Sequence, residues 1–201
     1  MAFVEKITKV VLVGPTEVGK TSIVNRINDN SWTENVTTTI GGGNIRKEIT
    51  SQSGVSRQLD IWDTAGQERY SSLLPIYIRD SNIILFVFDL ANLESLENLK
   101  QMYQQIQQNN LPLNNCTSYL IGNKLDKADG SEIESDIKSL KNFLSPAHFF
   151  KVSAKENINI DQILKQIQKD SDLFSTDKTT NVDIDPEAQT EHSTSSSSQC
   201  C

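Results

Sequence analysis

Hydrophobic positions follow two alternating patterns along most of the chain. Short runs of apolar and β-branched residues alternate with longer stretches in which apolar residues recur every three or four positions. This alternation predicts an α/β fold with a largely parallel sheet. The predicted strands cover residues 7–13, 44–50, 55–62, 83–89, 117–121 and 149–152. The predicted helices cover residues 19–28, 93–109, 131–143 and 158–172.

Polarity separates these strands into two kinds. Four runs are almost continuously apolar, at residues 10–13, 83–88, 119–121 and 149–150. Parallel strands covered by helices on both faces have this composition, so we expect these four at the sheet centre. The segments 44–50 and 55–62 are more polar and are joined by a Ser/Gly stretch, which predicts a hairpin at the sheet edge. The expected fold is a six-stranded, mostly parallel sheet with one antiparallel edge strand and helices on both faces.

Composition limits the class of protein. The 201 residues carry a net charge of −7, and no apolar run approaches the 18 or so residues that span a bilayer. The N-terminus lacks the apolar region of a secretory signal. Two histidines and three cysteines offer no zinc-ligand spacing, and an acidic chain does not suit a nucleic-acid surface. We therefore expect an intracellular protein without a Cys/His metal cage or a nucleic-acid partner.

The negative charge is concentrated at the C-terminus. From Asp170 onward there are seven acidic residues and one lysine, and Ser or Thr fills eleven of the 28 positions from Phe174 to the end. Such a segment buries too little apolar surface to offset the entropy of ordering it. We predict one folded domain over residues 1–173 and a disordered, acidic tail over residues 174–201.

A phosphate-binding motif follows the first predicted strand. Residues 14–21 read Gly-Pro-Thr-Glu-Val-Gly-Lys-Thr, which satisfies G-x-x-x-x-G-K-[ST] between a strand and a helix. Backbone N–H groups of such a loop converge on phosphate oxygens, Lys20 adds positive charge, and the Thr21 hydroxyl is a ligand for Mg²⁺. The predicted phosphate contacts are Gly14, Thr16, Glu17, Val18, Gly19, Lys20 and Thr21.

Two later segments select the base. Gly-Asn-Lys-Leu-Asp at 122–126 follows a buried strand, so it lies at the carboxyl edge of the sheet, where α/β proteins bind ligands. The Asp126 carboxylate can accept from N1–H and the 2-amino group of guanine. Adenine has no such donor pair, so this carboxylate favours GTP over ATP. Ser-Ala-Lys at 153–155 supplies backbone N–H groups to the same base.

These motifs resemble those of a Ras-superfamily small GTPase, specifically a Rab. The resemblance rests on residues 14–21, on Trp-Asp-Thr-Ala-Gly-Gln-Glu-Arg-Tyr at 62–70, on Asn-Lys-Leu-Asp at 123–126 and on Ser-Ala-Lys at 153–155. It covers residues 6–172. It implies a Ras-like fold and a monomeric GTP/GDP switch that uses Mg²⁺, hydrolyses GTP slowly and regulates vesicle trafficking.

The resemblance also implies roles for individual residues. Trp32 would stack on guanine, while Thr39 and Asp63 would hold Mg²⁺ together with the threonine of the phosphate motif. The N–H of Gly66 would bind the γ-phosphate, and Gln67 would orient the attacking water. The remaining guanine contacts implied are Asn123, Lys124, Asp126, Ser153, Ala154 and Lys155. We assign no catalytic role to Asp89, the last residue of a predicted strand.

The chain departs from the Rab pattern in two places. Ile-Gly-Gly-Gly-Asn at 40–44 stands where Rabs usually have Ile-Gly-Val-Asp-Phe, so the effector triad would be Asn44, Trp62 and Tyr77, without its first aromatic residue. The three glycines predict a mobile segment. Thr16 and Glu17 replace small residues of the phosphate loop. No arginine has the spacing that would place it at the γ-phosphate, so we expect slow turnover and an activating protein that supplies the charge.

The chain ends in Cys200 and Cys201, which fits the double geranylgeranylation of Rabs. One lipid chain gives only marginal membrane binding, and this tail has no basic patch to assist it. The expected location is the cytoplasmic face of intracellular membranes, in exchange with the cytosol. The partners implied are an exchange factor, a GTPase-activating protein, effectors, a prenyl-transfer escort and a GDP-dissociation inhibitor.

Two other functions remain open at this point. The altered phosphate loop is compatible with a GTP-dependent binding scaffold that has little or no hydrolytic activity. A P-loop nucleotide kinase is the second alternative, although a kinase would need a lid over its acceptor substrate and would not need Asp126.

Overall fold

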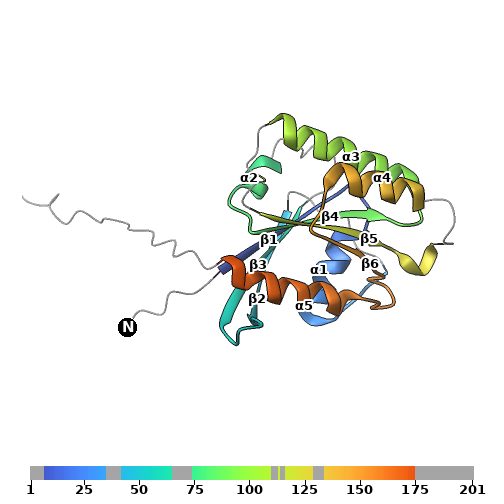
Figure 1. The fold of residues 1–201 in the computed structure, drawn as a ribbon. Helices are drawn as coiled ribbons and strands as arrows, with labels where there is room; N and C mark the ends of the chain where they lie inside the picture. The colour runs from blue at the N-terminus through green and yellow to red at the C-terminus, as the bar shows by residue number, and fades with distance from the viewer. Residues whose placement is uncertain are drawn as a thin grey trace, which may run out of the picture.

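A six-stranded sheet runs through the middle of the protein (Figure 1). The computed structural model describes residues 7–34, 42–64, 74–109, 113, 116–128 and 134–174. The strands are β1 (Ile7–Val13), β2 (Gly42–Thr50), β3 (Ser56–Thr64), β4 (Ile83–Asp89), β5 (Thr117–Asn123) and β6 (His148–Lys151). Their order is β2-β3-β1-β4-β5-β6, and β2 alone runs antiparallel to its neighbour. The predicted sheet is thus confirmed.

The order of the strands corrects one expectation. Three of the four apolar runs, in β1, β4 and β5, lie inside the sheet, but β6 lies at its edge and all four of its residues are only half-buried. The interior place belongs to β3, which pairs with β2 on one side and β1 on the other. Apolar character reports how well the faces of a strand are covered, not how many strands flank it.

The glycines at the start of β2 also differ from expectation. Gly42 and Gly43 pair with Thr64 and Asp63, so the ladder begins two residues before the predicted start and includes residues predicted to be mobile. Gly41 lies outside the described residues. A Cβ on Gly42 would lie 3.0 Å from the Tyr77 hydroxyl, and its φ is 147°. Glycine is therefore used here for close packing within a strand, where main-chain bonds need no side chain.

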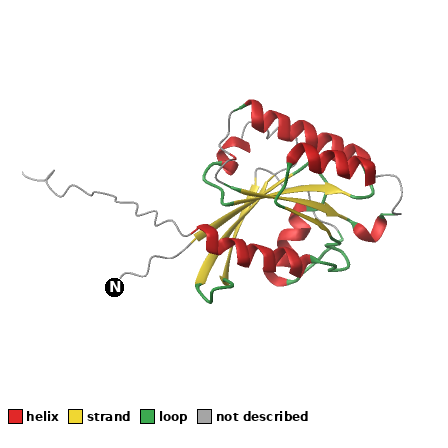
Figure 2. Cartoon of the chain, viewed as in Figure 1, coloured by secondary structure: helices red, strands yellow, loops and turns green. Residues whose placement is uncertain are grey.

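Helices cover both faces of the sheet (Figure 2). One face carries α1 (Lys20–Asp29) and α5 (Ile160–Asp170), and the other carries α2 (Leu74–Ile78), α3 (Leu93–Gln108) and α4 (Glu134–Leu144). The four predicted helices are confirmed with ends shifted by up to three residues. Helix α2 was not predicted, because five residues are too few to show a helical period. None of the described helices is long and apolar enough to cross a membrane.

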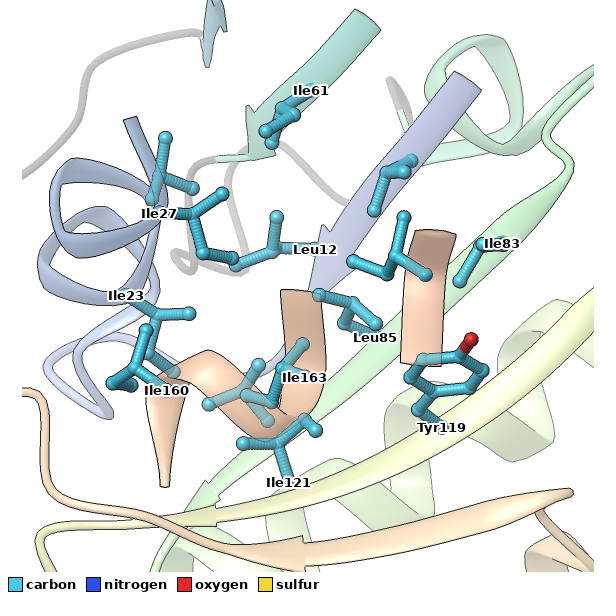
Figure 3. Packing of buried hydrophobic residues seen from close by; sticks show 14 of the residues in the cluster. Leu12, Ile23, Ile27, Ile61, Ile83, Leu85, Tyr119, Ile121, Ile160 and Ile163 are labelled. Carbon is cyan, nitrogen blue, oxygen red and sulfur yellow. The ribbon is translucent and has the colours of Figure 1, made fainter. Parts of the chain in front are cut away.

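The core beneath α1 and α5 holds the start of α1 against the end of β1 (Figure 3). Ile23 and Ile27 from α1 pack with Ile160 and Ile163 from α5 over Leu12 of the sheet, and all five side chains are buried. Each such side chain contributes about 1.5–3 kcal/mol of transfer free energy. This packing fixes the loop between β1 and α1, which is the predicted phosphate-binding segment.

Polar contacts tie the end of α5 to the opposite end of the sheet. The buried Tyr119 hydroxyl donates to Asp170 Oδ2 at 2.7 Å, and burial together with this bond raises the pKa of Tyr119 far above its usual range. Beyond α5, Asp172 in the short 3₁₀ helix η4 (Ser171–Phe174) accepts from the Ser53 hydroxyl at 2.7 Å. The turn between β2 and β3 is therefore attached to the last described residues of the chain.

Candidate functional site

A cavity of about 410 Å³ opens at the carboxyl ends of the central strands. Most of the nucleotide-binding residues predicted from separate motifs line it. Those lining it are Thr16, Glu17, Gly19, Lys20, Thr21, Trp32, Asn123, Lys124, Asp126, Ala154 and Lys155. Gly14, Val18 and Ser153 are buried. Thr39, Gly66, Gln67, Cys200 and Cys201 lie outside the described residues.

Two glycines shape the loop that precedes α1. A Cβ on Gly14 would lie 2.2 Å from the carbonyl oxygen of Val87 in β4, so no side chain fits there. Gly19 has a φ of 92°, and a Cβ on it would lie 2.3 Å from Nδ2 of Asn123. The first and sixth positions of the motif must therefore be glycine for steric reasons, beyond any contact with a phosphate.

The Lys20 ammonium group lies inside this loop. Its Nζ donates to the carbonyl oxygens of Gly14 at 2.8 Å and Pro15 at 2.7 Å, and the residue is only 6% exposed. Burial lowers the pKa of Lys20 to about 8, and the nearby Asp63 carboxylate opposes that shift. A buried cation in a loop at a helix N-terminus is an attractive site for phosphate oxygens.

Thr21 and Asp63 place two oxygen ligands next to this cation. The Thr21 hydroxyl donates to Asp63 Oδ2 at 2.6 Å, which brings the first turn of α1 to the end of β3. Asp63 is 6% exposed. A hydroxyl and a carboxylate are ligands of the kind that Mg²⁺ prefers, so the residues present fit that ion.

Asn123 connects the phosphate loop to the segment after β6. Its Nδ2 donates to the carbonyl of Val18 at 2.8 Å, and its Oδ1 accepts from the N–H of Ala154 at 3.1 Å. The side chain is buried. Asn123 therefore holds together the two walls of the cavity.

The next residues of the motif are also held in place. Lys124 has a positive φ of 61°, and its Nζ lies 2.7 Å from Oδ2 of Asp89. Asp89, to which the sequence assigns no catalytic role, thus orients a lysine of the cavity wall. Asp126 Oδ1 accepts from the Ser153 hydroxyl at 2.5 Å, and this bond fixes the carboxylate toward one side of the cavity. Lys155 Nζ lies 6.0 Å from the ring centre of the half-buried Trp32.

Arg26 does not line the cavity but supports one of its walls, and the sequence did not point to it. From α1 its guanidinium donates to the carbonyl oxygens of Ala154 at 2.7 Å, Lys155 at 2.8 Å and Asn30 at 2.7 Å. Its three short hydrogen bonds go to backbone carbonyls, two of them 128 and 129 positions away, so no pattern of side chains points to it.

The three residues of the expected effector triad come together outside the cavity. Asn44 lies opposite Trp62 in the β2–β3 ladder, and the rings of Trp62 and Tyr77 are 5.8 Å apart. The Trp62 indole N–H donates to Asp60 Oδ2 at 2.9 Å, and Lys9 Nζ lies 5.1 Å from the centre of its ring. Of the three positions of the expected effector triad, two therefore carry aromatic side chains, Trp62 and Tyr77, and the third carries Asn44.

Comparison with known proteins points to one family. The model of the Ras family matches residues 9–172. Human Ras-related protein Rab-22A is 37% identical over 162 residues, which cover 80% of this chain and 81% of that protein. The Ypt/Rab-type GTPase YPT7 of Saccharomyces cerevisiae is 30% identical over 192 residues, or 90% of this chain and 92% of its own. Ras-related protein Rab-7b of Paramecium octaurelia is 30% identical over 196 residues, covering 92% and 95% of the two chains.

The sheet order and the loop around Lys20 define a P-loop nucleotide-binding protein of the α/β class. The chain belongs to the Ras family, and within it to the Rab type. It is a small GTPase that hydrolyses GTP and regulates vesicle trafficking. Membership of this family excludes the alternative that the chain is a P-loop nucleotide kinase.

We predict that Gly14→Ala lowers the free energy of unfolding by about 2 kcal/mol, because the new methyl group would collide with the carbonyl of Val87. Gly43→Ala is the matched control, since a Cβ there meets nothing within 4 Å, and it should change stability by less than about 0.5 kcal/mol. Urea unfolding of the two variants measures the difference. Equal midpoints would show that the loop has room that the structure does not indicate.

Proposed function

We propose that the cavity binds GTP and GDP with the phosphates on residues 14–21 and the guanine between residues 123–126 and 153–155. The observation that carries the proposal is that motifs separated by more than a hundred residues line one cavity. Its two ends differ in chemistry. One end has a buried cation and a loop at a helix N-terminus, and the other has an oriented carboxylate and an aromatic ring.

Base recognition follows from the Asp126 carboxylate. Held by Ser153, it presents acceptors to the N1–H and 2-amino group of guanine, and Trp32 supplies an apolar face for stacking. The Ala154 N–H and Lys155 lie on the same side of the cavity. An adenine would leave the carboxylate without donors, which is unfavourable for a desolvated charge.

Magnesium would be held by the hydroxyl of Thr21 and the carboxylate of Asp63, with Thr39 joining them when GTP is bound. When bound, the ion supplies positive charge to the phosphate oxygens. Lys20 supplies a second positive charge, and the loop amides orient the phosphates. These residues position the γ-phosphate without making or breaking a covalent bond themselves.

Hydrolysis would depend on Gln67, which orients the water in line with the leaving group, and on Gly66, whose N–H binds the γ-phosphate. None of the arginines in the described part of the chain lines the cavity. Arg26 is the arginine closest in sequence to the phosphate loop, and its guanidinium is bonded to three backbone carbonyls. We expect intrinsic turnover to be slow, about 10⁻⁴ to 10⁻² per second, with an activating protein that supplies positive charge at the γ-phosphate.

The switch would act at membranes through lipids on Cys200 and Cys201. A prenyl-transfer escort would deliver the lipids, and a GDP-dissociation inhibitor would return the GDP form to the cytosol. Exchange factors, activating proteins and effectors would complete the cycle. Support for this part comes from membership of the Rab type and from the two terminal cysteines.

Asp126→Asn should lower GTP affinity by about 100-fold or more, because one acceptor of the carboxylate becomes a donor. The same change should raise affinity for XTP, whose 2-oxo group suits the amide. Asp161→Asn, an exposed acid in α5 that pairs with Lys165, is the charge-matched control and should leave both affinities unchanged. Competition binding gives the GTP and XTP affinities of the unaltered protein and of the two variants. Equal GTP affinity in Asp126→Asn and the unaltered protein would sink the guanine assignment.

Gln67→Leu should slow single-turnover GTP cleavage by about tenfold or more, while GTP affinity stays the same. Gln101→Leu, at an exposed position of α3, controls for the loss of an amide. If the unaltered protein binds GTP and cleaves none of it, with or without an activating protein, the chain is the binding scaffold considered above.

Cys200→Ser and Cys201→Ser should each leave the protein mainly in the soluble fraction of its native cell, since one lipid chain gives marginal binding. Cys116→Ser, a half-buried cysteine of the folded body, should stay on the membrane. Fractionation with intact-mass measurement reports location and lipid content together. Membrane binding by the variant that lacks both terminal cysteines would contradict the anchor.

A further inference from the structure

A chain of hydrogen bonds runs from helix α1 to the carboxylate that is expected to read the base. It begins at Arg26, whose guanidinium donates to the carbonyl oxygen of Lys155 at 2.8 Å. The Glu156 N–H donates to the Ser153 hydroxyl oxygen at 3.0 Å, and that hydroxyl donates to Asp126 Oδ1 at 2.5 Å. These bonds link a half-buried arginine outside the cavity to an acidic residue that lines it.

The peptide bond between Lys155 and Glu156 joins the two parts of this chain of bonds. A trans peptide is planar, so its C=O and N–H groups point in opposite directions. Because Arg26 holds the carbonyl oxygen, the N–H of the same peptide is directed to the Ser153 oxygen. A serine hydroxyl has a single proton. Since the oxygen accepts from Glu156 on one side, its proton is directed to Asp126 on the other.

The neighbouring peptide of the same loop is fixed in the same way. Arg26 Nε donates to the carbonyl oxygen of Ala154 at 2.7 Å, and the plane of that peptide sets the direction of the Lys155 N–H. At the base of the loop, Ser153 and Ile158 exchange two main-chain hydrogen bonds of 3.1 and 3.0 Å. The backbone therefore closes the base of the loop, and the guanidinium holds its middle.

We propose that Arg26 is a positioning residue for base specificity. It does not line the cavity, but it fixes the Ser153 hydroxyl and, through that hydroxyl, the direction of the Asp126 carboxylate. A planar guanidinium can hold two adjacent carbonyls at once, whereas the ammonium group of a lysine is a single point on a flexible chain. Without Arg26 the carboxylate keeps its charge but loses its direction, so the 2-amino group of guanine is bound less well. This inference rests on the proposed nucleotide site and concerns how that site discriminates between purines.

The test compares the affinities of the full chain for GTP and ITP, measured by competition binding with Mg²⁺ in excess. The base of ITP has the N1–H and 6-oxo groups of guanine but lacks the 2-amino group. Arg26→Gln should lower GTP affinity about tenfold and ITP affinity about twofold, so the preference for GTP narrows about fivefold. Arg26→Lys keeps the positive charge and should restore little of this preference, because it cannot hold both carbonyls in the same geometry.

A double substitution tests whether Arg26 acts through the serine. Ser153→Ala removes the donor to Asp126 and should narrow the preference for GTP by a similar factor. Adding Arg26→Gln to Ser153→Ala should narrow it no further, because both changes act on the same carboxylate. Arg79→Gln is the control for the loss of an arginine, since Arg79 is exposed, pairs with Asp80 and does not line the cavity. It should leave both affinities unchanged.

Equal losses of GTP and ITP affinity in Arg26→Gln would overturn the inference, because a merely loosened site does not distinguish the two bases. Full recovery of the preference in Arg26→Lys, or a further narrowing when Arg26→Gln is added to Ser153→Ala, would also overturn it. If Arg26→Gln does not fold, the ratio of affinities in Arg26→Lys decides alone, since a narrowed ratio supports the inference and an unchanged one rejects it. The proposed function fails differently, namely if the unaltered protein binds GTP no better than ATP.

Discussion

A buried lysine held by the carbonyl groups of its own loop is the contact on which the site depends. The Lys20 ammonium closes the loop onto itself through the carbonyls of Gly14 and Pro15. In the same loop a Cβ on Gly14 would lie 2.2 Å from the carbonyl oxygen of Val87, and Gly19 has a φ of 92°. The site therefore depends on a short segment at the end of β1 that encloses a cation and has no room for a side chain at its first position.

The remainder of the fold brings distant segments to that loop. Parallel strands end at a common edge, so the residues after β5 and β6 lie beside the residues after β1 although they are far apart in sequence. Asn123 then bonds both walls through one amide, which can donate and accept at once. The buried side chains between the sheet and α1 keep this arrangement rigid, because a close-packed core resists small displacements.

The sequence predicts the parts of this structure that follow from local pattern. Strand and helix positions follow from the periodicity of apolar residues, and the cavity residues follow from motifs whose spacing is fixed by the chemistry of phosphates and guanine. The strand order does not follow, since the half-buried β6 reads as a central strand and β3 as an edge strand. Pairing between strands depends on the whole sheet, and it also draws Gly42 and Gly43 into β2 against their local preference.

Contacts to the backbone are the other part that the sequence does not reveal. Arg26 has no side-chain partner of opposite charge among its three short contacts to Ala154, Lys155 and Asn30, so neither charge pattern nor spacing indicates it. The positive φ of Glu17, 62°, is likewise a feature that no pattern in the sequence indicates.

The three bonds of Arg26 give the site a mechanical property. Helix α1 begins at Lys20 under the phosphate end of the cavity, and Arg26 on the same helix carries the loop that forms the other end. Both ends of the cavity are thus attached to the same helix, α1. A tilt of α1 would move the support of the phosphates and the support of the base together, so a partner that shifted this helix would loosen both ends of a bound nucleotide in a single motion.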